Sequence, residues 1–188
     1  MDKRKVILVT DGDGVAQKAV EIAAANIGGR CITASAGNPT VLTGKEIIEL
    51  IKKADRDPVV VMVDDKGQKG MGKGEIAMDA IMNSNDVDVL GVVAVSSNGK
   101  DCHKIPLSCS ITKDGNIIEG KSVDKHGNET EDKIMCGDTL SMLRRKKDVV
   151  IVGIGDPGKM DFKDDITKGA PITTMALKEV ILRSGWMQ

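Results

Sequence analysis

The stretch of sequence that decides the fold class is Pro58-Val59-Val60-Val61-Met62-Val63-Asp64-Asp65. Five consecutive apolar residues, 59–63, follow the proline, so the strand that they predict must be covered on both faces. A strand buried on both faces is typical of a parallel sheet that lies between two layers of helices. The stretch therefore predicts an α/β fold.

Strand and helix patterns alternate on both sides of this stretch. Strands are predicted at residues 5–10, 31–36, 59–63, 87–95 and 149–154. Helices are predicted at about 15–27, from Thr43 to about Ile51, and at about 75–82, 138–147 and 171–183. Thr43 and Glu46 have the spacing of a capping box. This order predicts a three-layer, mostly parallel, doubly wound sheet of the Rossmann-like or Toprim-like kind.

The alternation is interrupted by a segment with the pattern of β-hairpins. Asp114-Gly115 separates two short apolar runs, and His126-Gly127-Asn128 marks a second turn. A chain of 188 residues has the length of one domain. We therefore expect a single α/β domain over 1–188 with a β-hairpin insertion at about 100–130.

Composition excludes several classes of protein. The net charge is −1, and Phe162 and Trp186 are the only aromatic residues, so nucleic-acid binding is not expected. The apolar runs 59–63 and 89–95 are too short to span a bilayer, and the apolar stretch near the start is too short for a secretion signal. The sequence predicts a soluble protein in a cytosol-like compartment.

The four cysteines, Cys31, Cys102, Cys109 and Cys136, have irregular spacings and form no C-x-x-C pair. Reduced thiols are the expectation for such a pattern in a cytosol-like compartment. Two alternatives stay open: a zinc site that includes His103 and His126, and a disulfide between Cys102 and Cys109.

Polar residues follow the predicted strands, and ligands of open parallel sheets bind outside the carboxyl ends of the strands. We call this edge of the sheet the crest. Its candidate metal ligands are Asp11, Asp13, Asp64 and Asp65, which could hold calcium or magnesium. Its other candidate ligand-binding residues include Ser35 and Asn38, and Asp156 and residues 96–98 also fall there. The alternative is that Asp and Gly serve only as turn and capping residues after strands.

A lysine- and glycine-rich loop, 67–74, precedes the third predicted helix. It resembles a phosphate-binding loop, but Gly74 stands where the magnesium-binding Ser or Thr belongs. Accessible backbone amides and two lysines still favour a bound anion. The candidate residues are Lys69, Gly70, Gly72, Lys73 and Gly74. A mobile surface loop is the alternative.

Catalytic signals are weak. His103 and His126 fall in the insertion, and no serine lies in a nucleophile elbow, so a binding protein is favoured over an enzyme. The basic run 144–147 closes a predicted helix, where cations complement the helix dipole. Contact of this run with anionic lipid headgroups is the alternative.

Three groups of motifs together resemble one known family. They are 30–32 leading to 35–40, 57–65 with the glycine-rich loop into Glu75, and 155–158 with 169–174 and 183–186. They resemble the small, soluble form of stage V sporulation protein AE from endospore-forming bacteria, over essentially the whole chain. The resemblance implies a protein of the spoVA operon, whose products together move calcium and dipicolinic acid into the developing spore and out at germination.

The resemblance also implies a location and partners. A member without a membrane span would lie at the surface of the spore inner membrane, held by other SpoVA proteins. Dipicolinate, a small dianion, would match the lysine–glycine loop, and calcium would match the aspartates. The family supplies no catalytic residues. The alternatives are a pure scaffold and a Mg²⁺-dependent phosphoryl-transfer or Toprim-like enzyme in which Asp11, Asp64 and Asp65 hold the metal.

Overall fold

The computed structural model describes residues 3–68, 70–99 and 101–186. Its strands are β1 (Arg4–Val9), β2 (Arg30–Cys31), β3 (Val59–Met62), β4 (Val87–Val95), β5 (Cys102–Lys104), β6 (Cys109–Ile111), β7 (Ile117–Ile118), β8 (Ile134–Cys136) and β9 (Val150–Ile154). Its α-helices are α1 (Gly14–Asn26), α2 (Gly44–Lys52), α3 (Lys73–Met82) and α4 (Pro171–Ser184). None of the described helices is long and apolar enough to cross a membrane.

The main sheet has the order β2-β3-β1-β4-β9-β6-β7. Every neighbouring pair in it is parallel except β6 and β7, which form the predicted hairpin. β5 and β8 form a separate antiparallel pair. The prediction of a mostly parallel α/β sheet is confirmed, and the hairpin extends this sheet through the pairing of β6 with β9.

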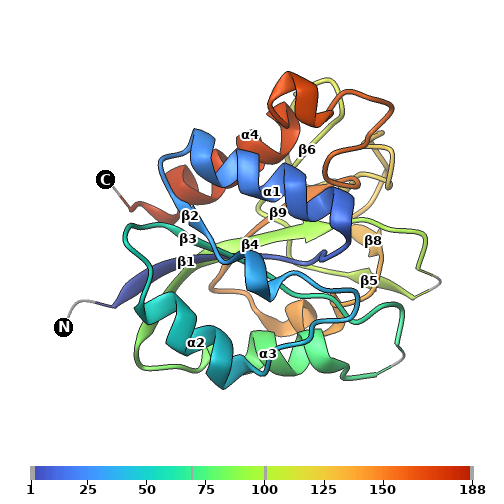
Figure 1. The fold of residues 1–188 in the computed structure, drawn as a ribbon. Helices are drawn as coiled ribbons and strands as arrows, with labels where there is room; N and C mark the ends of the chain where they lie inside the picture. Colours follow the sequence, from blue (N-terminus) through green and yellow to red (C-terminus); the bar gives the residue numbers. More distant parts are fainter. Residues whose placement is uncertain (1–2, 69, 100, 187–188) are drawn as a thin grey trace.

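Helices cover both faces of the sheet, which gives three layers (Figure 1). The alternation of side chains along β1 shows how the layers are filled. Val6 and Leu8 pack in a cluster with residues of α2 and α3, whereas Ile7 and Val9 pack with residues of α1 and α4. All four side chains are buried, as are Val59 to Met62 of β3. Burial of this apolar surface from both sides is the main stabilisation of the fold.

Local helix signals are confirmed where they were predicted. The Thr43 side chain accepts from the Glu46 amide, and the Glu46 carboxylate accepts from the Thr43 amide at 2.8 Å. Pro171 occupies the first turn of α4, and Gly185 ends it with a φ of 73°. The capping box supplies acceptors for amides at the start of α2, and Pro171 has no amide hydrogen to leave unpaired. The Gly185 amide donates to the Leu182 carbonyl at the end of α4.

The predicted strand at 31–36 is wrong beyond its first residue. β2 ends at Cys31, and a 3₁₀ turn, Thr33–Ser35, follows. Ser35 is fully buried; its hydroxyl donates to the Ile32 carbonyl at 2.6 Å and accepts from the Met62 amide at 2.9 Å. The hydroxyl thus connects the turn to β3. This connection takes the place of the backbone hydrogen bonds that a longer β2 would have formed with β3.

The predicted helix at 138–147 is also wrong. Only a five-residue 3₁₀ helix, Ser141–Arg145, forms there. The buried carboxylate of Glu75 accepts from the Ser141 hydroxyl at 2.5 Å and from the Met142 amide at 3.0 Å. The Glu75 carboxylate, which is remote in sequence, fixes the start of the 3₁₀ helix. Thr139, with a φ of 62°, turns the chain just before this helix.

The expectation of four reduced cysteines is wrong as well. Cys102 of β5 and Cys136 of β8 lie directly opposite each other in the antiparallel pair and form a disulfide. Cys109, the alternative partner of Cys102, is a free, buried thiol in β6. Pairing across 34 residues depends on how β5 and β8 meet, and sequence spacing alone does not reveal it.

The loop after β9 contains an unusual backbone turn. Met160, Asp161 and Phe162 have consecutive positive φ values of 49°, 53° and 64°. For residues other than glycine this conformation costs about 1–2 kcal/mol each. Asp161 forms an ion pair with Lys113 at 2.7 Å and lies 3.3 Å from Nδ1 of His126, so contacts to the insertion help to hold the turn.

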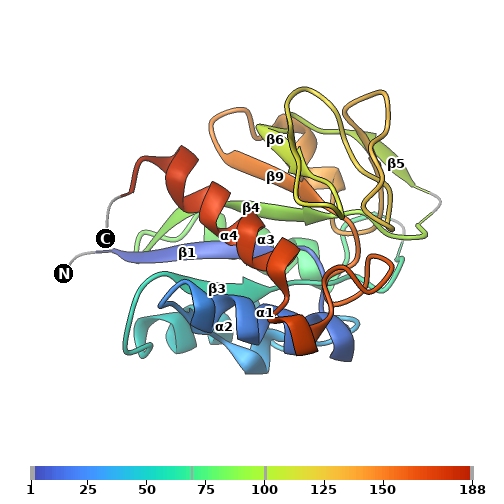
Figure 2. The same ribbon diagram turned by 90° about the horizontal axis from the view of Figure 1, so that it is seen from above.

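The ends of the described chain lie together at the edge where the strands begin, opposite the crest (Figure 2). Lys5 of β1 and Trp186 after α4 line one small cavity there. The insertion lies beside β9 on the other side of the molecule from α2 (Figure 2).

Candidate functional site

A cavity of about 380 Å³ lies at the crest, among the loops that follow β1, β3, β4 and β9. We call it the crest cavity. It is lined by Thr10, Asp11, Asp13, Asn38, Asp64, Lys66, Gly67, Val95, Ser97, Asn98, Gly99, Asp138, Asp156 and Lys159. Five of these are aspartates and two are lysines, so the cavity is predominantly acidic.

Asp11 lies directly after β1 with its carboxylate turned back on the chain. Its Oδ1 accepts from the amide of Gly12 at 2.7 Å and from that of Asp13 at 3.2 Å. Burial, followed by the negative charge of Asp13, raises the pKa of Asp11 to about 6. Burial disfavours the charged carboxylate, and these amides compensate for it only in part.

Asp64 follows β3 and is almost fully buried, with 4% of its surface exposed. Its Oδ1 accepts from the Lys66 amide at 2.8 Å. The pKa of Asp64 is raised to about 7, mainly by burial, and the nearby carboxylates of Asp138 and Asp11 contribute to this increase.

The opposite wall of the cavity is held by an ion pair. Asp13 caps α1, since its Oδ1 accepts from the amides of Val15 and Ala16 at 2.8 Å each, and its Oδ2 pairs with Lys159 at 3.0 Å. Burial disfavours the charged form of Asp13, but the hydrogen bond from the Ala16 amide and the pairing with Lys159 have the larger effect, so the pKa of Asp13 is lowered. Burial also raises the pKa of Asp156, which lies 3.7 Å from Lys159.

The crest cavity brings together seven of the residues that the sequence placed at the crest: Asp11, Asp13, Asn38, Asp64, Ser97, Asn98 and Asp156. Ser35 is not among them, because its hydroxyl is used inside the fold. In the described part of the chain, no three histidine, cysteine or acidic side chains come close enough to hold a metal ion. The crest therefore offers individual carboxylates and not an assembled metal site.

Asp65 points away from the crest cavity towards the start of α3. Its Oδ1 accepts from the amide of Gly74 at 2.6 Å and from that of Glu75 at 3.3 Å. A side chain at Gly72 would collide with the Asp65 carboxylate, and one at Gly74 would lie 2.6 Å from the Asp64 amide nitrogen. Both glycines are thus required by packing around an internal cap.

This internal cap limits the anion site predicted in the lysine–glycine loop. The amides of Gly74 and Glu75 are two of the donors that such a site would use, and Asp65 already occupies them. Gly70 has a positive φ of 81°, and Lys73 is exposed at the first position of α3. Lys69 lies outside the described residues.

Three charged lining residues were not predicted: Lys66, Asp138 and Lys159. Lys159 lies just beyond the turn-rich Gly155-Asp156-Pro157-Gly158, so that signal could have indicated it. Asp138 had no such signal, because it reaches Asp64 only through the path of the chain after β8. Its carboxylate also accepts from the Gly67 amide, which ties this segment to the loop after β3.

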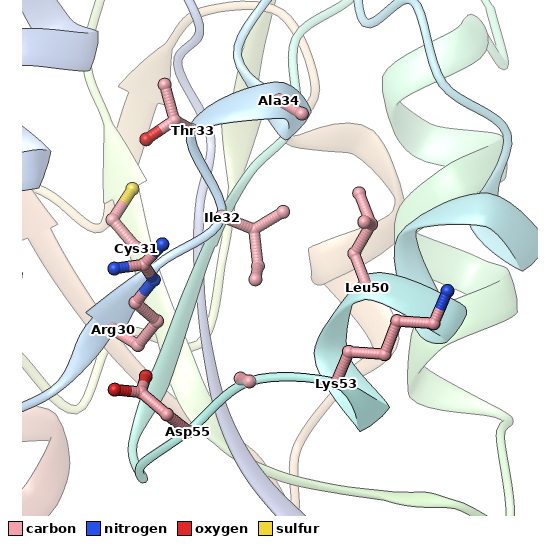
Figure 3. A pocket seen from close by; sticks show the side chains of 9 residues that line it. Arg30, Cys31, Ile32, Thr33, Ala34, Leu50, Lys53 and Asp55 are labelled. Atoms are coloured by element: carbon pink, nitrogen blue, oxygen red, sulfur yellow. The ribbon is translucent and has the colours of Figure 1, made fainter.

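A second cavity, of about 490 Å³, lies between β2 and the end of α2. Ile32 and Leu50 face each other across it, with Arg30 and Asp55 at one end (Figure 3). Burial raises the pKa of the Cys31 thiol to about 12, so this cysteine stays protonated and is a poor nucleophile. Nothing in this cavity favours catalysis over packing.

Comparison with known proteins identifies one family. The family model described as stage V sporulation protein AE1, SpoVAE, matches residues 5–184, from β1 to the end of α4. Comparisons with curated proteins and with solved structures give no match. The match includes the crest cavity, the insertion and all four helices described above.

Proposed function

We propose, because this chain belongs to the stage V sporulation protein AE1 family, that it is an accessory protein of the SpoVA machinery. Membership implies a role in sporulation. The proposal goes further: the chain supports the movement of calcium and dipicolinic acid, at the surface of the spore inner membrane and through contacts with other SpoVA proteins. The observation that carries it is the extent of the family match, which includes every strand and helix of the fold.

The geometry of the crest supports binding over chemistry. Among the described residues that line the crest cavity there is neither histidine nor cysteine, and Asp65 lies elsewhere, so the metal triad of the phosphoryl-transfer alternative is not assembled. Apart from Val95, the lining side chains are Asp, Lys, Asn, Ser and Thr, which hold polar groups through hydrogen bonds and charge. A small polar ligand or a polar segment of a partner suits such a surface.

The test is genetic and quantitative. Spores that lack the gene should accumulate dipicolinic acid more slowly during sporulation, or release it more slowly during germination, and the wild-type chain should restore the rate. Dipicolinic acid can be followed by the luminescence of its terbium complex. Uptake and release rates equal to those of the parent strain would refute the proposal. Cosedimentation with spore inner membranes, lost when other SpoVA proteins are absent, would establish the location and the partners.

Calorimetry with dipicolinate, with calcium and with both together tests the ligand. Binding at the crest should weaken in Asp64→Ala and persist in Lys73→Ala, because Lys73 does not line the crest cavity. The reverse pattern would place the anion at the lysine–glycine loop. Absence of heat at millimolar ligand would leave protein partners as the mode of action.

A further inference from the structure

The largest cavity among those described, about 960 Å³, lies away from the crest cavity, between α3 and the 3₁₀ helix Ser141–Arg145. We call it the basic groove. It is lined by Met71, Glu75, Asp79, Lys104, Ile105, Pro106, Lys133, Ser141, Met142, Arg144, Arg145 and Lys146. These residues come from α3 and the loop before it, from the ends of β5 and β8, and from the 3₁₀ helix. The groove thus joins segments that are far apart in sequence.

Positive charge dominates the basic groove in a chain whose net charge is −1. Five of the lining residues are cations and two are acids. One of the acids, Glu75, is buried with 2% of its surface exposed, and its Oε1 is taken up by Ser141 and Met142. Negative charge available at the surface of the groove is therefore small.

Most of these cations lack an internal partner. In the described part of the chain, Arg144, Arg145 and Lys146 form no ion pair. Lys104 lies 3.9 Å from Asp132, and Lys133 donates to a backbone carbonyl at 3.1 Å. Clustered, unpaired cations repel one another, so their contribution to folding is unfavourable or negligible.

The helix-dipole explanation of the basic run does not apply to this structure. A 3₁₀ helix of five residues has too few aligned peptides for a substantial dipole at its end. The lipid alternative also fits poorly, because the cations line a cavity together with Met71, Pro106 and Met142, and a flat membrane surface would meet only the rim of that cavity. Met71, 62% exposed, and Met142 provide flexible apolar contacts in that cavity.

We propose that the basic groove binds an acidic, extended segment of a partner protein. Carboxylates of the segment pair with Arg144, Arg145 and Lys146, and an apolar side chain packs against Met71 and Met142. A segment suits the groove better than a small anion does, because the cations are spread over three elements and only a multivalent ligand reaches them together. The inference rests on the proposed function, in which the chain works by binding partners.

The test uses the full chain and a fluorescein-labelled peptide of glutamate and leucine, with fluorescence anisotropy as the readout. Wild-type protein should bind it, with an affinity that falls as salt is raised. The double variant Arg144→Ala/Arg145→Ala should weaken binding about tenfold. Arg144→Lys/Arg145→Lys keeps the charge and should recover most of the loss, which separates lost charge from lost folding.

The matched control is Arg30→Ala/Arg56→Ala, which removes the same charge near β2, and it should leave binding unchanged. Equal weakening by this control would overturn the inference, because the effect would then come from net charge. Equal binding of a lysine–leucine peptide would overturn it too. So would binding to phosphatidylglycerol vesicles with no binding to the acidic peptide, since the occupant would then be a membrane.

Spores distinguish failure of the groove from failure of the proposed function. If the acidic peptide does not bind while deletion of the gene still slows dipicolinic acid movement, only the proposal that the basic groove binds an acidic segment is refuted. If the peptide binds as described but deletion has no effect on the rates of dipicolinic acid uptake and release, the proposed function is refuted and the proposal for the basic groove is retained.

Discussion

Carboxyl groups on the two walls of the crest cavity respond to the fold in opposite ways. Burial moves the pKa of Asp64 upward, from 3.8 to about 7, whereas the Ala16 amide and Lys159 outweigh burial and move that of Asp13 downward. A group whose pKa is higher in the folded state stabilises the fold fully below its unfolded pKa and loses that contribution as pH rises through the folded value. For Asp64 the loss falls between about pH 4 and pH 7.

We predict that Asp64→Asn is more stable than wild type at pH 8 by about 1–2 kcal/mol, because asparagine has no charge to bury. The gain should shrink at pH 5, where Asp64 is protonated in the folded protein. Urea denaturation at the two pH values measures both differences. Asp13→Asn is the contrast: it keeps an N-cap but loses the Lys159 pair, so it should be less stable than wild type at pH 8. A gain from Asp64→Asn that is larger at pH 5 would contradict the assignment.

Phe162 gives a second prediction at this scale. Its side chain is 77% exposed and its φ is 64°, so it has little packing to lose and a costly backbone conformation. Phe162→Gly should therefore raise the free energy of unfolding by about 0.5–1 kcal/mol. Phe162→Val should lower it by a similar amount, since a β-branched residue tolerates a positive φ poorly. Thermal unfolding of the two variants measures both changes. A lower stability of Phe162→Gly would contradict the prediction and would mean that the phenyl ring contributes packing to the fold.

At the scale of elements, two helices begin on an aspartate that is not their neighbour in sequence. Asp65 caps α3 from nine residues away, and Asp164 caps α4. Asp164 is fully buried and accepts from the amides of Gly158, Ile172 and Thr173 and from the Thr173 hydroxyl. The turn at 160–162 places Asp164 at the start of α4. The hydrogen bonds of Asp164 offset part of the conformational free energy that the positive φ values of this turn cost.

We predict that Asp164→Ala lowers the free energy of unfolding by about 3 kcal/mol or more, because it leaves several buried donors without an acceptor. The neighbouring Asp165 is the control. It is only partly buried and caps only a short 3₁₀ turn, so Asp165→Ala should cost about 1 kcal/mol or less. Urea midpoints of the two variants give the comparison. Equal effects would show that the remote cap contributes little.

These caps show what the sequence could and could not predict. Thr43 and Glu46 are three residues apart, so the start of α2 was predicted with its mechanism. The start of α3 depends on Asp65, which was instead interpreted as a metal ligand, because an Asp after a strand has the same local pattern in either role. The 3₁₀ helix at 141–145 was mistaken for an α-helix, since its shape depends on the remote carboxylate of Glu75.

At the scale of the whole molecule, the layers and the parallel sheet were predictable because they follow from runs of apolar residues. The positions of Asp11 and Asp64 at the crest were predictable, because each lies two residues after the end of a strand, β1 and β3. Asp138 was missed, because only the path of the chain after β8 brings it to the crest cavity beside Asp64. The basic groove was missed for the same reason, as its cations gather from β5, β8 and the segment after it.

We predict that the chain unfolds in one cooperative transition as a single domain, with the insertion included. β6 pairs with β9 and β7 with β6, so the insertion shares the main sheet. Trp186 fluorescence and far-ultraviolet circular dichroism should give the same urea midpoint. A reporter in the insertion, Ile117→Trp in a Trp186→Phe background, should give it too. An earlier transition at the reporter would show that the insertion unfolds by itself.

The placement of the chain ends has a practical consequence for all the spore experiments. The ends of the described chain lie at the edge of the sheet opposite the crest, where Lys5 and Trp186 line one cavity. A fluorescent protein or an affinity handle fused at either end would therefore project away from the crest cavity. The same labelled chain can serve for imaging, for purification and for complementation without blocking that cavity.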